Sequence, residues 1–497
     1  MIPRFLSIAA PLFVYFSLGL LAFGLFRERK SIEWVGGVAA AIALTASFAL
    51  VTPVHQLFFD EDIYIHIASN LSHAPVGQIT LLGGPQESEV SSYYKTPVGF
   101  PVLLSLVFLF TGTSEAVAFT IARIIFSLLV AGVYQLARRM GLERSQALAA
   151  AIVFASVPVC FRFSVSAGTD LLAALWAVLG MCGIAAGNGP LAVAGMALAA
   201  QTRLELIALV PLLFLSRAIP KQWKFAGLGL ILAELLHVEW VLSAAPAFAA
   251  FERVPSAFAF ATVLPNFKTN VAYFLDPLRF PVLVPLLSIV TLVRREKLHL
   301  ALWTVVLFGV YLFFYAGSFD LTPRYSIQII APMAVLAVSA IKHRYAIPAL
   351  LLSAALAFWH WPNGPEYVPA LILDHAIATE VASTLGQDEL VISTEPEVFL
   401  NHGVHAMNSF YAASLQELPL ERLRRYRRVL YYAGAQTNVV NTAEWRADEW
   451  IKSHYKLRLI DSHKIGEIWI AYFDLSAKTD DRVGDIGTSS GPERDGR

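Results

Sequence analysis

The sequence predicts a mainly α-helical membrane protein, with a polytopic bundle of about 11 to 13 transmembrane helices and a C-terminal extracytoplasmic α/β domain. Three observations indicate this fold class. Of the 497 residues, 57% are hydrophobic and 15% are charged, whereas soluble proteins contain about 25% charged residues. Apolar segments long enough to cross a bilayer recur through residues 1–361. Beyond residue 361, short β-type runs alternate with polar helical segments.

Charge and cysteine content exclude several classes of function. The chain has 37 basic and 37 acidic residues, so its zero net charge gives no reason to expect a nucleic-acid partner. Cys160 and Cys182 both lie in apolar stretches, which predicts no disulfide framework and no cysteine-based zinc site. The first apolar run, 6–26, lacks a charged leader and a small-residue cleavage site, so we expect a retained helix.

The predicted spans are segments of mostly apolar residues about as long as a bilayer is thick. Segment 98–111 is too short to span, and the apolar region 190–216 is interrupted by polar residues at 201–205. The candidate spans are 5–26, 34–53, 116–137, 147–163, 170–186, 225–245, 280–293, 300–317, 325–341 and 345–361.

Basic residues in the short loops predict the orientation of these spans. Placing every basic cluster in the cytoplasm gives a consistent alternation, provided that 190–216 enters and leaves from the cytoplasmic side or forms two half-helices. Asp60, Asp170, Arg324 and everything after residue 361 then face the other side of the cytoplasmic (inner) membrane. The clusters are Arg27/Arg29/Lys30, Arg138/Arg139/Arg144, Arg217/Lys221/Lys224, Arg294/Arg295/Lys297 and Lys342/Arg344.

Domain boundaries follow from the change in pattern. We expect a transmembrane domain at 1–361 with its first extracytoplasmic loop at 54–97, an α/β domain at 362–476, and a disordered tail at 477–497. Strands are predicted at 389–393, 428–433, 457–461 and 467–473, and helices at 415–426 and 442–454.

The first extracytoplasmic loop contains the strongest candidates for chemistry. Asp60, Glu61 and Asp62 follow the second span, and we expect Asp60 to sit at the outer end of that helix. Carboxylates at a membrane boundary are costly unless they are solvated or paired. One of them could act as a general base, and two together could hold a divalent metal ion. A hydrated helix end is the alternative.

Cationic side chains beside the same face could bind a phosphate. Lys95 precedes a short apolar segment, and Arg324 with Tyr325 begins a later span. An ammonium or guanidinium group there can neutralise an anionic leaving group. Snorkelling of Lys95 and interfacial anchoring by Arg324 are the alternatives.

Further charges lie within apolar segments. Asp170 opens a predicted span, and Arg203 and Glu205 fall at the interruption of 190–216. A helix break with charged residues is typical of the polar lining of a cavity. An internal ion pair that serves structure is the alternative, and we prefer it to a direct role in catalysis.

Taken in order, these motifs resemble the C-type superfamily of polytopic glycosyltransferases, in the branch of protein O-mannosyltransferases and lipid A aminoarabinose transferases. Phe59-Asp60-Glu61 with Tyr64 is similar to the family's Asp-Glu loop motif. The segment from Lys95 to Pro101 resembles its Lys-Pro-Pro segment, except that Thr96 replaces the first proline. Thr202-Arg203-Leu204-Glu205 resembles a Thr-Arg-x-Glu turn, and Arg324-Tyr325 the Arg-Tyr pair before a late helix. The likeness covers the first two thirds of the chain.

This resemblance implies a membrane glycosyltransferase that uses a polyprenyl-phosphate-linked sugar and inverts the anomeric carbon. Asp60 would be the general base, assisted by Glu61. The substrate-binding residues would be Tyr64, Lys95, Asp170, Arg203, Glu205, Arg324 and Tyr325. The acceptor would be an extracytoplasmic lipid, glycan or protein. The resemblance implies no certain cofactor, and a divalent metal ion stays open.

Two other functional classes fit parts of the sequence. A transporter or lipid flippase also has broken helices and buried charges. The chain shows no inverted repeat, however, and its large loop directly after a span is unusual for a transporter. A non-catalytic membrane scaffold would use the C-terminal domain to bind a partner.

Overall fold

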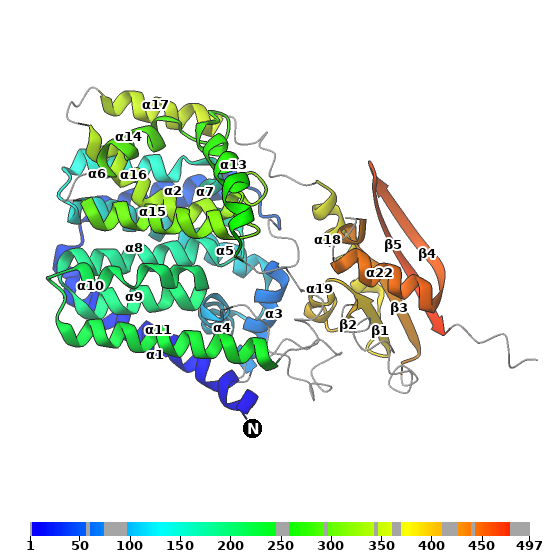
Figure 1. Cartoon of the computed structure of the whole chain (residues 1–497). Coiled ribbons are helices and arrows are strands. Elements are labelled where there is room, and N and C mark those ends of the chain that lie inside the picture. The colour runs from blue at the N-terminus through cyan, green and yellow to red at the C-terminus, as the bar shows by residue number, and fades with distance from the viewer. Residues whose placement is uncertain are drawn as a thin grey trace, which may run out of the picture.

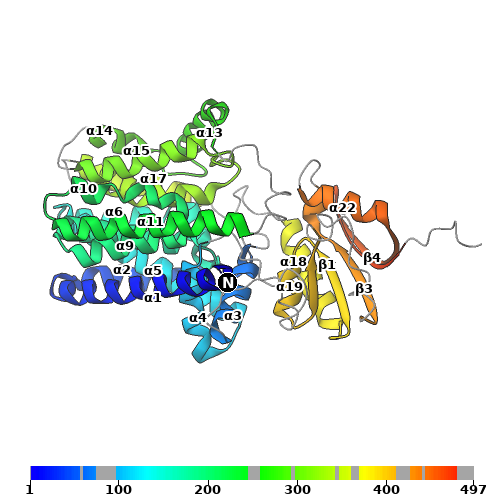
Figure 2. The ribbon, with the colours of Figure 1, turned by 60° about the horizontal axis from the view of Figure 1, so that its bottom comes forward.

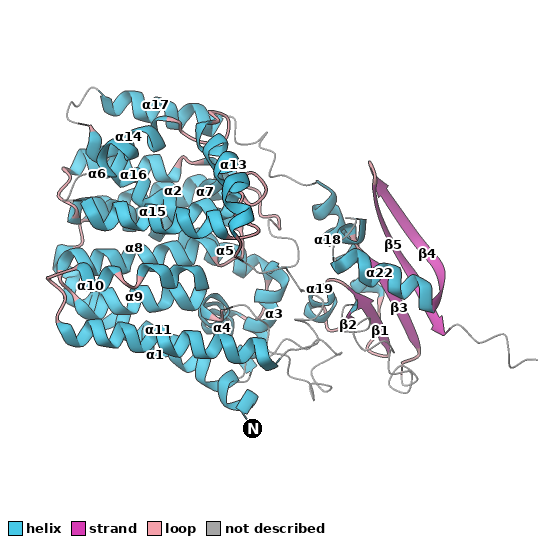
Figure 3. Ribbon diagram, in the orientation of Figure 1, coloured by secondary structure: helices cyan, strands magenta, loops and turns pink. Residues whose placement is uncertain are grey.

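The computed structural model describes residues 2–55, 60–73, 97–244, 258–292, 297–341, 346–359, 369–409, 426–438 and 443–477. These residues form a large helical bundle and, from residue 369 onward, a smaller part that contains all the described named strands (Figures 1 and 3). The predicted fold class, a mainly α membrane bundle followed by an α/β domain, is confirmed.

Most helices of the bundle lie side by side, and α3 stands at the end nearest the α/β domain in two views (Figures 1 and 2). The helices are α1 (Ile2–Glu28), α2 (Trp34–Leu50), α3 (Asp60–His73), α4 (Gly99–Thr111), α5 (Glu115–Arg139), α6 (Arg144–Ala155), α7 (Pro158–Arg162), α8 (Asp170–Ala186), α9 (Gly189–Thr202), α10 (Leu212–Leu215), α11 (Lys221–Ala244), α13 (Val263–Leu275), α14 (Leu283–Leu292), α15 (Leu298–Phe313), α16 (Ile327–Ala340) and α17 (Ala346–Trp359).

Few of these helices have the full length of a membrane span. Within the described residues, Ala9–Ser31 and Glu115–Arg139 pass a test of length and hydropathy, and α6 with Pro158–Val165 would make a third, bent by 71°. The bend falls just before Pro158, which has no N–H to continue a helical ladder. Other apolar helices contain 10–17 residues. Several predicted spans are therefore shorter helices than the hydropathy pattern suggested.

The interruption predicted at 201–205 is a helix break. Helix α9 ends at Thr202, Arg203 has an extended backbone (φ −145°, ψ 118°), and a 3₁₀ helix, η3 (Leu204–Leu209), follows. The start of α4 approaches this break closely, because a Cβ built on Gly99 would lie 2.7 Å from the carbonyl oxygen of Gln201. Glycine at this position allows the two backbones to meet.

Basic loop residues gather at one end of the bundle. Arg139 pairs with Glu28, and Arg138 pairs with Glu33 at 2.9 Å. Lys297 bonds to the carbonyl oxygen of Met140. These contacts join three of the five basic clusters at the end where α1 and α5 finish, whereas α3 lies at the opposite end (Figure 1). These described basic residues therefore share one end of the bundle, and the assignment of that end to the cytoplasm stays a prediction.

The α/β domain has a five-stranded mixed sheet in the order β2-β1-β3-β5-β4. Strand β1 pairs in parallel with β2 and β3, and the pairs β3–β5 and β5–β4 are antiparallel. The elements are α18 (Pro369–Thr384), β1 (Glu389–Ser393), α19 (Pro396–Asn401), β2 (His405–Asn408), β3 (Arg428–Ala433), α22 (Ala443–His454), β4 (Tyr455–Ile465) and β5 (Ile468–Ala477).

The four predicted strands are all present, and the helix predicted at 442–454 is α22. Strand β2 and helices α18 and α19 were not predicted. Most of the helix predicted at 415–426 and nearly all of the tail lie outside the described residues.

Helix α3 connects the bundle to the α/β domain. The side chain of Asn401, at the end of α19, donates to the carbonyl oxygen of Asp62 at 3.3 Å. Its Oδ1 atom lies 3.3 Å from Nδ1 of His66. Burial lowers the pKa of His66 to about 4, so this imidazole is neutral at pH 7. Neutral polar contacts therefore hold α19 against α3.

Candidate active site

Asp60 is the first residue of α3 and does not sit at the outer end of the second span, where the sequence predicts it. Helix α2 ends at Leu50, so a separate helix presents the carboxylate. Three acidic residues occupy the first turn of α3, where they interact favourably with the positive end of the helix dipole. The Asp60 side chain is 28% exposed, which leaves it accessible to a substrate.

Arg324 is the direct partner of Asp60. Its Nη1 atom donates to Oδ2 of Asp60 at 2.9 Å, and its side chain is 20% exposed. Among the described residues this is the one hydrogen bond of the guanidinium. Since arginine carries five N–H donors, the others remain available to an anion beside the Asp60 carboxylate.

Glu61 anchors the start of α3 to the bundle. Its Oε1 atom accepts hydrogen bonds from Ser166 Oγ at 2.7 Å and from the backbone N–H of Ala167 at 2.9 Å. The side chain is fully buried. These bonds come from the segment just before α8, so Glu61 fixes the position of its neighbour Asp60.

Arg203 is the centre of a second cluster of charged side chains, at the helix break. Its Nε atom donates to Oε1 of Glu205 at 2.6 Å, and its Nη1 atom bonds to Oδ1 of Asp170. Residues two apart do not face each other on a continuous helix, but Arg203 and Glu205 can meet because the helix ends at Thr202. Tyr311 adds a hydrogen bond of 3.2 Å to Glu205. This ion-pair network matches the structural alternative preferred from the sequence.

The ring of Tyr325 is close to both guanidinium groups. The Cζ atom of Arg203 is 4.7 Å from the ring centroid, and that of Arg324 is 5.5 Å from it. Tyr311 stacks on Tyr325 with an interplanar angle of 5°. Cations near an aromatic face gain from the ring quadrupole. Tyr325 therefore links the network around Arg203 to the Asp60–Arg324 pair.

The remaining predicted residues have different environments. Tyr64 is buried and packs edge-on against Phe100, with ring centroids 5.8 Å apart. Burial and the carboxylate of Asp60 raise the pKa of Tyr64 above its usual range, so it stays a neutral phenol. Lys95 lies outside the described residues.

Sequence reasoning missed several polar residues at this end of the bundle. Tyr311 lies within an apolar span, and nothing local distinguishes it from an interfacial tyrosine. His55, Glu115 and His375 meet Asp62 beside the start of α3. Asp62 belonged to the acidic run noted in the sequence, and His55 lies only five residues before Asp60. The closeness of His55 to the acidic run is the sequence feature that could have indicated this cluster.

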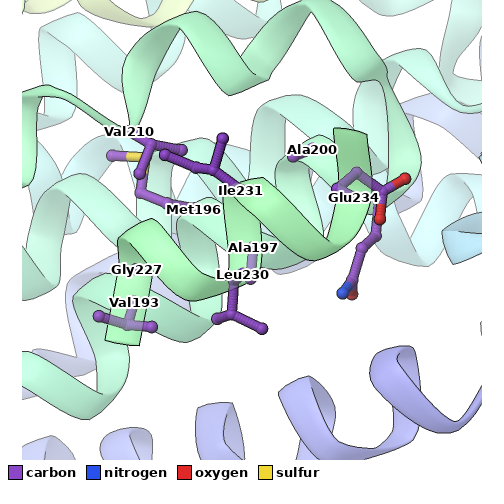
Figure 4. A pocket seen from close by; sticks show the side chains of 10 residues that line it. Val193, Met196, Ala197, Ala200, Val210, Gly227, Leu230, Ile231 and Glu234 are labelled. Atoms are coloured by element: carbon purple, nitrogen blue, oxygen red, sulfur yellow. The ribbon is translucent and has the colours of Figure 1, made fainter. Parts of the chain in front are cut away.

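A pocket between α9 and α11 does not take part in this arrangement (Figure 4). Its lining is apolar except for Gln201 and Glu234. Because it presents no basic group, the pocket does not suit a phosphate.

The geometry can support a displacement reaction. An accessible carboxylate can accept a proton from a nucleophile, and a cation with unused donors 2.9 Å away can stabilise a departing anion. The ion-pair network of Arg203 and the hydrogen bonds of Glu61 hold the surrounding segments in place.

Structural comparison identifies the fold. Crystal structures of ArnT from Cupriavidus metallidurans, in the apo state and bound to undecaprenyl phosphate, align with a TM-score of 0.56 and 14% identity over 89% of this chain and 97–98% of theirs. The apo oligosaccharyltransferase of Archaeoglobus fulgidus aligns with a TM-score of 0.50 and 13% identity, over 90% of this chain and 75% of that one. The chain has the GT-C fold of polytopic membrane glycosyltransferases.

This result confirms, at the level of fold, the resemblance found in the sequence. No protein-family model matches the chain, and no curated protein matches it significantly in sequence. The GT-C likeness therefore shows the architecture, while the roles of individual residues rest on their geometry.

Proposed function

We propose that this GT-C protein is a membrane glycosyltransferase that moves a sugar from a polyprenyl-phosphate donor to an extracytoplasmic acceptor. The observation that carries the proposal is the accessible Asp60 carboxylate 2.9 Å from Arg324 at one end of the bundle. One structural neighbour has been crystallised with undecaprenyl phosphate, which supports a lipid phosphate as the donor class.

In the proposed reaction Asp60 takes a proton from an acceptor hydroxyl or amine. The nucleophile forms a bond to the anomeric carbon as the bond from that carbon to the phosphate oxygen breaks. The phosphate leaves with the bonding electron pair, and the configuration inverts. Arg324 would neutralise the phosphate, and the sequence resemblance adds Lys95 as a second cation. Arg203 is committed to Asp170 and Glu205, so its role would be to position Tyr325 and Arg324.

Arg324→Ala should weaken use of the donor more than use of the acceptor. A charge-assisted hydrogen bond contributes about 1.5–3 kcal/mol, so the donor concentration for half-maximal transfer should rise roughly 10-fold or more. The measurement is initial transfer rates in vesicles at varied donor and acceptor. Arg458→Ala, in an 82% exposed arginine of the α/β domain, is the control. An unchanged donor dependence in Arg324→Ala would remove Arg324 from phosphate binding.

The α/β domain should lie outside the cytoplasm. A cysteine tag after Arg497 should react with an impermeant maleimide in intact spheroplasts. Arg144→Cys, at a position 68% exposed at the basic end of the bundle, should react only after permeabilisation. The native Cys160 and Cys182 are buried, so background labelling should be low. Labelling of Arg144→Cys alone in intact cells would invert the topology.

A further inference from the structure

Four potential metal ligands meet where the α/β domain contacts the bundle. They are His55 in the segment after α2, Asp62 on α3, Glu115 at the start of α5 and His375 on α18. One ligand atom from each lies within 4.8 Å of the others. Three of these segments belong to the bundle, and the fourth belongs to the α/β domain.

The distances between ligand atoms suit a small tetrahedral ion. Zinc bonds of about 2.0–2.2 Å place neighbouring ligand atoms about 3.4 Å apart. Nε2 of His375 lies 3.2 Å from Oδ2 of Asp62 and 3.9 Å from Oε1 of Glu115. His55 offers Nδ1 at 3.6 Å from Asp62 or Nε2 at 3.5 Å from Glu115. These spacings lie on both sides of the expected one, and the ligand atoms of the whole set, which lie within 4.8 Å of one another, would move closer together on metal binding.

Buried polar atoms in this cluster lack hydrogen bonds. Within the described part of the chain, neither ring nitrogen of His55 nor Oδ2 of Asp62 makes one of acceptable geometry. The side chains are only 9% and 1% exposed, respectively. Leaving such atoms unsatisfied is costly, and native proteins rarely do so. A shared cation would coordinate Oδ2 of Asp62 and one ring nitrogen of His55, and Oε2 of Glu61 lies 3.2 Å from Nδ1 of that ring.

We propose that His55, Asp62, Glu115 and His375 bind a divalent transition-metal ion, with Zn²⁺ the best chemical match. Two imidazoles and two carboxylates are ligands that zinc accepts. A divalent ion balances the two carboxylates while both imidazoles remain neutral. Glu115 is 37% exposed, which gives the ion a path from solvent.

The ion would fasten the α/β domain to the helix that presents Asp60. Asp62 lies two residues after Asp60 on α3, and His375 approaches it from α18. The rings of His55 and His375 stack with centroids 3.8 Å apart, so one ring would turn on metal binding to bring both nitrogen lone pairs to the same ion. Metal binding would therefore restrict both the domain contact and the orientation of the first turn of α3. Its role is positional, because none of the four ligands is Asp60 or Arg324.

A metal-free network is the rival explanation. Burial disfavours a charged His55, but the carboxylates of Asp62, Glu115 and Glu61 outweigh burial and raise its pKa well above the usual value. An imidazolium among carboxylates would need no ion. The two states differ in their response to chelators and to added zinc.

The first test measures bound metal and thermal stability in the full-length protein purified in detergent. After incubation with ZnCl₂ and desalting, the wild type should retain one zinc per chain by elemental mass spectrometry. EDTA should lower its melting temperature by about 5 °C, and added Zn²⁺, but not Mg²⁺, should restore it. His402→Ala, at an exposed histidine on the same domain, should behave as wild type. His375→Ala should retain no zinc, and its melting temperature should not change with EDTA or Zn²⁺.

A second measurement does not depend on any variant folding. Replacing zinc with Co²⁺ in the wild type should produce the visible absorption bands of a four-coordinate site with nitrogen ligands. Substoichiometric zinc in the wild type, with no shift in melting temperature and no cobalt bands, would overturn the proposal in favour of the imidazolium network. These readouts use no glycosyl transfer, so they stand or fall separately from the proposed enzyme activity.

Discussion

Asp60→Asn should abolish sugar transfer while leaving the protein folded. Asparagine keeps the shape of the side chain and can still contact Arg324, but it cannot accept a proton from the acceptor. Removing a general base typically costs about 10²- to 10⁴-fold in rate. The measurement is transfer from a polyprenyl-phosphate-linked sugar in membrane vesicles, with expression and gel-filtration behaviour recorded for each variant.

The matched control is Asp461→Asn, which makes the same chemical change at a 55% exposed position on β4. It should transfer at the wild-type rate. Full transfer activity in Asp60→Asn would exclude Asp60 as the base and would assign proton transfer to another group. Loss of activity accompanied by loss of folded protein would instead make Asp60 a structural residue.

Arg203→Met should destabilise the bundle strongly. The substitution leaves the carboxylates of Asp170 and Glu205 buried without their cation, since the Asp170 side chain is 2% exposed and that of Glu205 is 18% exposed. Breaking a buried ion pair by removing one partner costs about 3–5 kcal/mol. Denaturant unfolding in detergent should show this decrease in the free energy of unfolding.

Arg279→Met is the appropriate comparison because its partner Asp320 is 48% exposed. Removing an exposed ion pair should change stability by about 1 kcal/mol or less. Adding Asp170→Asn to Arg203→Met should recover part of the lost stability, because one of the two unpaired charges is removed. Equal effects of Arg203→Met and Arg279→Met would show that the cluster at the helix break is not a buried network.

Hydropathy was enough to predict the helical bundle, because each membrane segment satisfies its backbone hydrogen bonds internally. The start of α8 at Asp170 and the break after Thr202 were both visible in the sequence. Strand β2 was not predicted, since it has only four residues and depends on parallel pairing with β1. Short strands of this kind are defined by their partners more than by their own pattern.

The candidate site was only partly predictable. The sequence indicated the acidic run at Asp60 and the charges at Arg203 and Arg324 as separate features. It could not show that Asp60 pairs with Arg324, because that contact depends on how α3 packs against the residues before α16. The meeting of His55 and His375 was harder still, since it requires the α/β domain to dock on the bundle.

The central claim is most directly tested by mass spectrometry of envelope lipids and glycans from cells that lack the gene. Complementation with the wild-type chain should restore one sugar substituent that is missing from a lipid, glycan or protein, and should deplete an accumulated polyprenyl-phosphate-linked sugar. Complementation with Asp60→Asn should do neither. Identical glycan and lipid profiles with and without the wild-type gene would contradict the assignment of this chain as a glycosyltransferase.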